Sequence, residues 1–244
     1  MNILIDIKNI CKKYRVGSND LFALNNISLK INEGEFVTII GKSGSGKSTL
    51  MNILGFLDTP SSGEYYLFGN PVFKIKENNL AEIRNKMVGF IFQSFNLIPN
   101  LTALENVELP LIYRGMPKSK RIILAKEALF KVGLSERLNH KPAQLSGGQQ
   151  QRTAIARAIA GNPSIILADE PTGNLDSAAG EEVLSILKSL NSEKKTVILI
   201  THDDKIAKSA SRVIKIMDGK LCTWMPKYLA PSGVCATYTK SASF

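Results

Sequence analysis

The strongest constraint on this chain is a glycine-rich stretch between an apolar run and a helix-like segment. The pattern G-x-x-x-x-G-K, followed by Ser or Thr, matches residues 41–48. The apolar run 36–40 before it has the composition of a strand buried on both faces, and the stretch 47–57 after it is predicted to be helical. A strand, a glycine turn and a helix are the context in which this pattern forms a phosphate-binding loop.

Each part of this phosphate loop has a predicted role in binding a nucleotide. The glycines let the backbone curl, so that successive N–H groups and the positive end of the helix face a phosphate chain. We expect Lys47 to reach the β and γ phosphates and the Ser48 hydroxyl to coordinate Mg²⁺. The residues predicted to bind the nucleotide here are Gly41, Lys42, Ser43, Gly44, Ser45, Gly46, Lys47, Ser48 and Thr49.

A second strand-like run, residues 165–168, ends in two acidic residues, Asp169 and Glu170. We expect this strand to open beside the phosphate loop in the same sheet. Asp169 would then hold Mg²⁺ through a water, and Glu170 would orient and deprotonate the water that attacks the γ-phosphate. An acid pair at a strand end can also be merely solvated, so this prediction depends on the phosphate loop.

Residues 145–149, with the sequence LSGGQ, precede a predicted helix over 150–160. The serine and the two glycines would stand at the N-terminus of that helix, which favours a second anion site. The same residues are also typical of a simple serine N-cap with flexible glycines. Because the phosphate loop is present, we favour the anion site, which comprises Ser146, Gly147, Gly148 and Gln149.

The remaining pattern predicts an α/β fold with a second lobe. The N-terminal segments 1–10 and 27–31 and the stretch 65–68 read as strands. The block from about 80 to 160 is mainly helical, and element boundaries are predicted at Pro99, Pro110, Pro117 and Pro142. The apolar runs 165–168 and 197–200 flank a helical segment, which is the alternation of a parallel sheet.

Composition adds limits to these predictions. The chain has 244 residues and 44% of them are hydrophobic, as in an ordinary globular protein. No apolar run approaches the roughly 18 residues of a membrane-spanning helix, and the first residues lack the pattern of a signal peptide, so we expect a cytoplasmic protein. The three cysteines show no metal-type spacing and predict neither a disulfide framework nor a zinc site.

Two segments are unusual in composition. The net charge is +10, and residues 111–141 contain eight Lys or Arg against two acidic residues, which is compatible with a membrane-facing or anion-binding surface. The segment 221–244 has no acidic residue and no periodicity, so we expect it to be disordered or loosely packed.

The order of these motifs resembles that of the ATP-binding subunits of ABC transporters, in which LSGGQ is the signature sequence between the phosphate loop and the acid pair. The resemblance covers about residues 3–220. It implies a P-loop NTPase core with a mainly parallel sheet, an N-terminal antiparallel β part and an inserted helical subdomain at about residues 94–160. It also implies an ATPase in which two copies close on two ATP molecules.

The resemblance implies further roles for single residues. Gln93 matches the glutamine that contacts Mg²⁺ and the transmembrane partner, and His202 matches the switch histidine that contacts the γ-phosphate. Tyr14 matches the aromatic residue that stacks on adenine, and Asp176 lies in the loop that couples the two sites of the dimer. Taken alone, a strand-end histidine is more often structural, and an exposed strand tyrosine needs no ligand.

A finer resemblance is to the branch that contains the macrolide-exporter and lipoprotein-release ATPases, carried by residues 90–99, 101–110, 169–176 and 201–203. Lys42 replaces the proline usual after the first glycine, and Thr153 replaces a more usual valine, but neither change touches a required position. In this branch the ATPase pairs with membrane subunits that transmit force to an extracytoplasmic domain.

The finer resemblance implies a transmembrane permease partner and a location on the inner face of the cell membrane. It favours export or extraction of a peptide, antibiotic, lipid or lipoprotein. An importer subunit and a regulatory ATPase that controls a cell-wall partner are the alternatives. A nucleic-acid partner is not expected, because there is no long coiled coil between the motifs and no second ATPase cassette.

Overall fold

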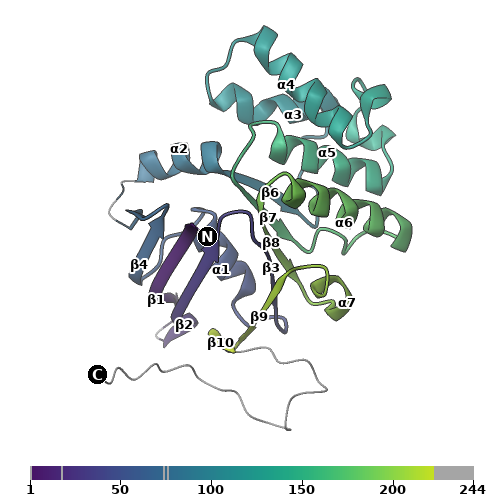
Figure 1. Ribbon diagram of the computed structural model, residues 1–244. Coiled ribbons are helices and arrows are strands. Elements are labelled where there is room, and N and C mark those ends of the chain that lie inside the picture. The colour runs from purple at the N-terminus through teal and green to yellow at the C-terminus, as the bar shows by residue number, and fades with distance from the viewer. Residues whose placement is uncertain (1, 18, 74, 76, 223–244) are drawn as a thin grey trace.

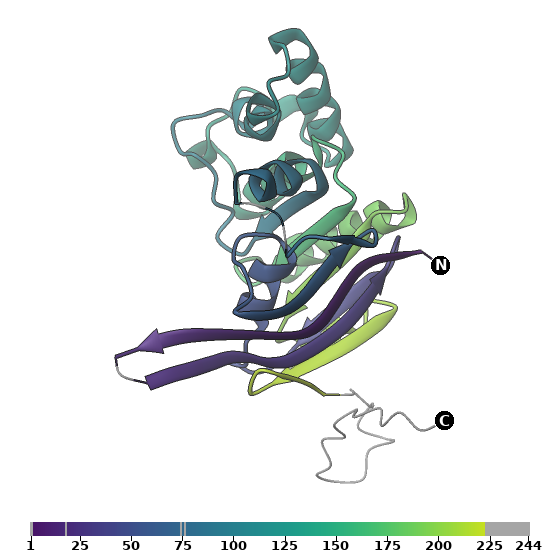
Figure 2. The same ribbon diagram turned by 90° about the vertical axis from the view of Figure 1, so that its left-hand side faces the viewer.

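The computed structural model describes residues 2–222 except 18, 74 and 76, and within this part the strands form two sheets (Figures 1 and 2). The smaller, antiparallel sheet has the order β2-β1-β4-β5 and consists of β1 (Ile3–Val16), β2 (Asn19–Asn32), β4 (Ser62–Leu67) and β5 (Asn70–Pro71). The larger has the order β10-β9-β3-β8-β7-β6 and consists of β3 (Phe36–Ile40), β6 (Val88–Phe92), β7 (Ile165–Asp169), β8 (Thr196–Thr201), β9 (Arg212–Met217) and β10 (Lys220–Cys222). Only the β9–β10 pair of this sheet is antiparallel. The predicted mainly parallel sheet with an N-terminal antiparallel β part is confirmed.

The larger sheet is covered on both faces, which explains why its strands are continuous apolar runs. Alternate residues of β7 and β8 belong to different core clusters: Leu167 and Ile198 face the antiparallel sheet and α1, whereas Ile166 and Leu199 face the group of helices on the other side. The two clusters lie on opposite faces of one sheet and cover both. Polar side chains can therefore gather at the carboxyl ends of its strands.

The helices differ in which face of the sheet they cover (Figure 1). α1 (Lys47–Leu54) packs between the two sheets, and α2 (Glu77–Met87) lies next to β6. On the other face are α3 (Ala103–Tyr113), α4 (Lys118–Lys131), the short η1 (Ser135–Arg137) and η2 (Pro142–Gln144), α5 (Gly147–Ile159) and α6 (Ser177–Ser192). The short helix α7 (Asp204–Ala207) follows β8.

Pro117 and Pro142 lie at element boundaries and Pro99 lies in the loop before α3, but the boundary predicted at Pro110 is wrong, because this residue lies inside α3. A proline inside a helix removes one backbone hydrogen bond. The helix nevertheless continues to Tyr113, where its buried face includes Val107 and Leu111, and Thr102 and Glu105 form a capping box at its start.

The two ends of the described chain lie in strands. β1 and β2 pair along their length, and their hairpin end projects from the body of the molecule in Figure 2. Leu221 and Cys222, which the sequence assigned to a loose tail, complete β10 and pair with Ile216 and Lys215. The rest of the predicted tail, 223–244, lies outside the described residues.

Gly89 on β6 provides a test of how tightly the sheet packs on α5. A Cβ atom at this position would fall on the backbone carbonyl of Ala158, so we expect Gly89→Ala to lower the free energy of unfolding by about 1–3 kcal/mol. Gly180→Ala in α6 is the matched control, because its added Cβ would make an ordinary contact of 3.6 Å with Thr172 and would raise helix propensity by up to about 1 kcal/mol.

Denaturant unfolding of the two variants and the native chain measures both changes. If Gly89→Ala were as stable as Gly180→Ala, the close contact between β6 and α5 described here would be contradicted.

Candidate functional site

The phosphate loop runs from the end of β3 to the start of α1, where Gly46 is the N-cap with a φ of 102°. An added Cβ on Gly46 would also meet the carbonyl oxygen of Ala23 on β2, so both the backbone conformation and the space require glycine. The Lys47 ammonium donates to the carbonyl oxygens of Gly41 (2.8 Å) and Lys42 (2.9 Å). The lysine is therefore held across its own loop.

The acid pair stands at the end of β7, as predicted. Asp169 is half-buried, and its pKa is raised by burial and by the neighbouring Glu170, while Lys47 opposes the rise. The Glu170 backbone has a φ of 45°, and its N–H donates to the carbonyl of Ile200 on β8 (2.9 Å). The pair is thus bound to the next strand and faces the phosphate-loop lysine.

The Glu170 carboxylate is held by the two residues at the end of β8. The Thr201 hydroxyl donates to Oε2 at 3.2 Å, and Nδ1 of His202 lies 2.7 Å from Oε1. His202 itself is exposed. These contacts orient one carboxylate while leaving the imidazole accessible.

Gln93 follows β6 and is linked to the segment after Glu170. Its Nε2 donates to Oδ1 of Asn174 at 3.1 Å, and Nδ2 of Asn174 donates back to the Gln93 carbonyl at 3.1 Å. The side-chain nitrogen, not the oxygen, is used in this contact. The amide oxygen of Gln93 is the atom with which it can ligate a cation.

These groups surround one cavity of about 600 Å³. The residues that line it are Ser43, Gly44, Gly46, Lys47, Ser48, Thr49, Gln93, Asp169, Glu170 and His202. They come from the phosphate loop and α1 and from the ends of β6, β7 and β8, which shows how the parallel sheet brings distant motifs together. Gly41, Lys42 and Ser45 belong to the same loop but do not line the cavity.

Ser146, Gly147, Gly148 and Gln149 do not line this cavity in the described part of the chain. Ser146 is the N-cap of α5, with its Oγ accepting from the Gln149 N–H at 3.3 Å and Oε1 of Gln149 accepting from the Ser146 N–H at 3.0 Å. The serine cap is therefore present. A cap does not exclude an anion site at the same helix end, and the anion site remains a proposal. Asp176 caps α6 by accepting from the Ala179 N–H at 2.9 Å.

Tyr14 lies on β1 in the antiparallel sheet and does not line the cavity. Its hydroxyl donates to Oδ2 of Asp58 at 2.9 Å, and the ammonium of Lys12 lies 5.1 Å from the centre of its ring. Burial, together with the Asp58 hydrogen bond, raises the pKa of Tyr14. Two groups thus fix the ring orientation.

Sequence reasoning missed the residues that hold the site residues in place, namely Asp58, Asn174 and Thr201. Asn174 and Thr201 stand inside segments that carried the finer resemblance, so their positions were marked although their contacts were not. Asp58 gives no signal in the sequence, because its partner Tyr14 is 44 positions away.

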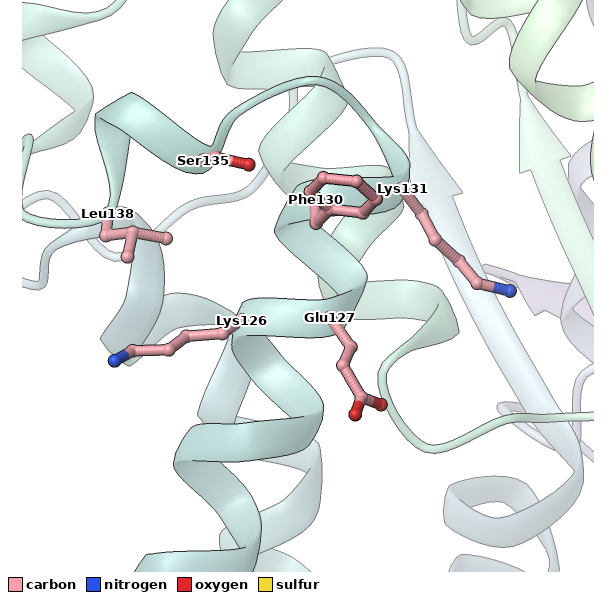
Figure 3. A pocket seen from close by; sticks show the side chains of 6 residues that line it. All are labelled: Lys126, Glu127, Phe130, Lys131, Ser135 and Leu138. Carbon is pink, nitrogen blue, oxygen red and sulfur yellow. The ribbon is translucent and has the colours of Figure 1, made fainter.

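A second hollow of about 560 Å³ lies on α4 and η1, in the basic segment 111–141 (Figure 3). In Figure 3, Phe130 lies near the middle of the lining side chains, with Lys131 to its right, Glu127 below it, and Ser135, Leu138 and Lys126 to its left. Its lining is mainly apolar and contains none of the nucleotide-site residues. The hollow therefore does not belong to the cavity at the strand ends.

Comparison with known proteins decides the family. The family model described as ABC transporter matches residues 24–173, more than half of the chain. The chain belongs to the ABC transporter family. An uncharacterized ABC transporter ATP-binding protein of Methanocaldococcus jannaschii, MJ1508, is 56% identical over 218 residues, which are 89% of this chain and 97% of that protein.

Two further relatives place this ABC ATPase within the family. The macrolide export ATP-binding/permease protein MacB of Pasteurella multocida is 50% identical over 98% of this chain, which spans only 36% of that protein. The solved dimeric structure of the ABC transporter cassette MJ0796 of Methanocaldococcus jannaschii has a TM-score of 0.83 and 51% identity over 89% of this chain and 96% of that one. A second structure of MJ0796 is described as a post-hydrolysis state bound to ADP and Pi.

The comparisons confirm the resemblance, the P-loop NTPase fold class and the ATPase activity. The roles of the single site residues are not tested by them and stay predictions. None of the described helices has the length and apolarity needed to cross a bilayer.

Lys47 is the residue on which nucleotide affinity should depend most. We expect Lys47→Ala to weaken ATP binding about 10–100-fold, because hydrogen bonds to charged groups contribute about 1.5–3 kcal/mol. Lys208→Ala removes one positive charge at an exposed position outside the cavity and is the control. Titration with a fluorescent ATP analogue measures both, and native affinity in Lys47→Ala would remove the phosphate-loop interpretation.

Proposed function

We propose that this chain hydrolyses ATP with Mg²⁺ in a closed dimer of two copies and so drives a membrane permease for export or extraction. One observation carries the proposal. The cavity holds the phosphate loop, Gln93, the acid pair and His202, but no described residue of the α5 N-terminus lines it. The chain therefore supplies two half-sites at two separate places, and a second copy can complete each one.

ATP binding uses the loop and its helix. The N–H groups and the positive helix end at the start of α1 suit a phosphate chain. The Lys47 ammonium now donates to two carbonyl oxygens of the loop and would donate to the β and γ phosphates instead. Tyr14 would stack on the adenine ring, with Asp58 and Lys12 fixing its orientation.

The residues at the cavity fit a magnesium ion. Ser48, Gln93 and Asp169 all line it and offer a hydroxyl, an amide oxygen and a carboxylate, which are the hard oxygen donors that Mg²⁺ prefers. Asp169 would act through a bound water. When bound, the ion would supply positive charge that offsets the negative charge developing on the phosphates.

Glu170 would act as the general base for the attacking water. Its carboxylate is oriented by Thr201 and His202, and it lines the same cavity as Lys47 and Ser48. It would take a proton from the water as the oxygen attacks the γ-phosphate, and ADP would leave. His202 would contact the γ-phosphate through its exposed ring.

The second copy would complete the site with the start of its α5. Ser146, Gly147 and Gly148 would donate to the γ-phosphate of the opposite ATP, with Gln149 beside them, and Asp176 would connect the two sites. The dimeric structures of MJ0796, 51% and 50% identical to this chain, support this arrangement. Because ATP would bind the closed dimer better than the open one, binding would shift the equilibrium toward closure.

The proposed membrane role depends on the relatives and on surface chemistry. MacB of Pasteurella multocida is named as both an ATP-binding and a permease protein. We infer that this chain meets a separate or fused permease through the segment around Gln93, on the inner face of the cell membrane. The basic segment 111–141, which also exposes Tyr113, Ile123 and Phe130, is suited to lie near anionic lipid.

Glu170→Gln tests the chemistry. We expect ATP binding to be retained, the closed dimer to accumulate on a sizing column and turnover to fall by about 10²–10⁴-fold, the contribution of a positioned base. Glu193→Gln, which removes a surface carboxylate paired with Lys131, should keep native turnover. Native turnover in Glu170→Gln would show that the base is another group.

Mixing Glu170→Gln with Ser146→Arg tests the shared site. Each variant alone lacks one half of every site, whereas a mixed dimer has one site with both halves intact. We expect ATPase activity to reappear on mixing, and its failure to reappear although mixed dimers form would contradict completion in trans.

Purification of the tagged chain from detergent-solubilised native membranes with ATP present tests the transport role. We expect a partner with few membrane spans and a large extracytoplasmic domain. A partner with many spans together with a solute-binding protein would indicate an importer, and the absence of any membrane partner would contradict the proposed coupling to a permease.

A further inference from the structure

α5 buries a glutamine that reaches the loop behind the acid pair. Gln151 is fully buried, and its Nε2 donates to the carbonyl oxygen of Pro171 at 2.6 Å. Its Oε1 is buried without a hydrogen-bond partner in the described part of the chain. A polar side chain is rarely buried with one of its atoms unsatisfied. The buried glutamine therefore needs an explanation, and its one hydrogen bond shows where to look for it.

The partner of Gln151 is the carbonyl of Pro171, the residue that follows Glu170. The Glu170 backbone has a positive φ, which a residue with a side chain adopts only when its surroundings hold it there. The Glu170 N–H is bound to Ile200, and the carbonyl of the next residue is bound to Gln151. The backbone that carries the carboxylate is therefore fixed from β8 on one side and from α5 on the other.

α5 is also bonded to the Gln93 segment, so these contacts form a closed ring. Arg157 donates to the carbonyl oxygens of Phe95 and Asn96, and the Gln93 and Asn174 amides bind each other. The ring runs from α5 through Pro171 to Asn174, then to Gln93 and back through Arg157. A shift of α5 would therefore move the Glu170 backbone as well.

We propose that Gln151 is a positioning residue for ATP hydrolysis, which acts through the Pro171 carbonyl to hold the Glu170 carboxylate where it can take a proton from water. The inference rests on the proposed role of Glu170 as the base. It gives α5 a function in its own subunit, in addition to the one its N-terminus would have in the opposite site.

Gln151→Met tests this role, because methionine keeps the shape of the side chain and removes both the donor and the unsatisfied oxygen. We expect kcat to fall about tenfold, since small displacements of catalytic groups have large effects on rate, while KM for ATP stays within about twofold. The ATP-dependent dimer should accumulate, as in Glu170→Gln, because closure would be intact and hydrolysis slow.

Gln150→Met is the matched control. Gln150 is the neighbouring glutamine on α5, and it donates to the Leu145 carbonyl at 3.1 Å, away from the acid pair. It should keep native kcat and KM. General damage to α5 would instead lower nucleotide affinity or prevent dimer formation in Gln151→Met.

A native kcat in folded Gln151→Met, or a fall in kcat that comes with a matching rise in KM and loss of the dimer, would overturn the inference. Glu170→Gln in the same assay separates this from the proposed function. If Glu170→Gln is inactive and Gln151→Met is native, only the positioning role fails, whereas a native Glu170→Gln removes the base assignment itself.

Discussion

The in-register pairing of four parallel strands is the constraint on which the site depends. Hydrogen bonds set Ile40 level with Thr201 and Phe92 level with Asp169, while β7 and β8 join Asp169 to Ile200. The residues that follow these strand ends must therefore emerge at the same edge. A slip of one residue between β7 and β8 would turn Asp169 to the other face and separate Glu170 from Thr201 and His202.

α5 connects the strand ends to the helices that cover the sheet. It packs on β6 at Gly89, forms an ion pair of 2.7 Å with α6 through Arg152 and Glu182, and binds the segments after β6 and β7 through Arg157 and Gln151. Among the described residues, those at its N-terminus do not line the cavity of their own chain. One helix thus holds the site of one subunit and presents the group proposed for the site of the other.

How far sequence could predict this structure follows from the range of the interactions involved. The phosphate loop and the strands around it were predictable because apolar runs and glycine spacing are local signals, and the order of motifs located Glu170 and His202 at strand ends. The contact of Asp58 with Tyr14 and that of Gln151 with Pro171 join distant positions, and no local pattern marks them. Pro110 misled the prediction because its local preference was outweighed by the packing of α3.

The capping box at Ser146 has a consequence for how α5 could meet a phosphate. Its Oγ already accepts from the Gln149 N–H, and its hydroxyl hydrogen remains free to act as a donor. A hydroxyl that accepts a hydrogen bond becomes a stronger donor, since neighbouring bonds polarise one another. The Ser146 oxygen that caps α5 is therefore also the atom that would donate to a phosphate in the proposed dimer, so helix capping and the proposed ligand contact depend on one atom.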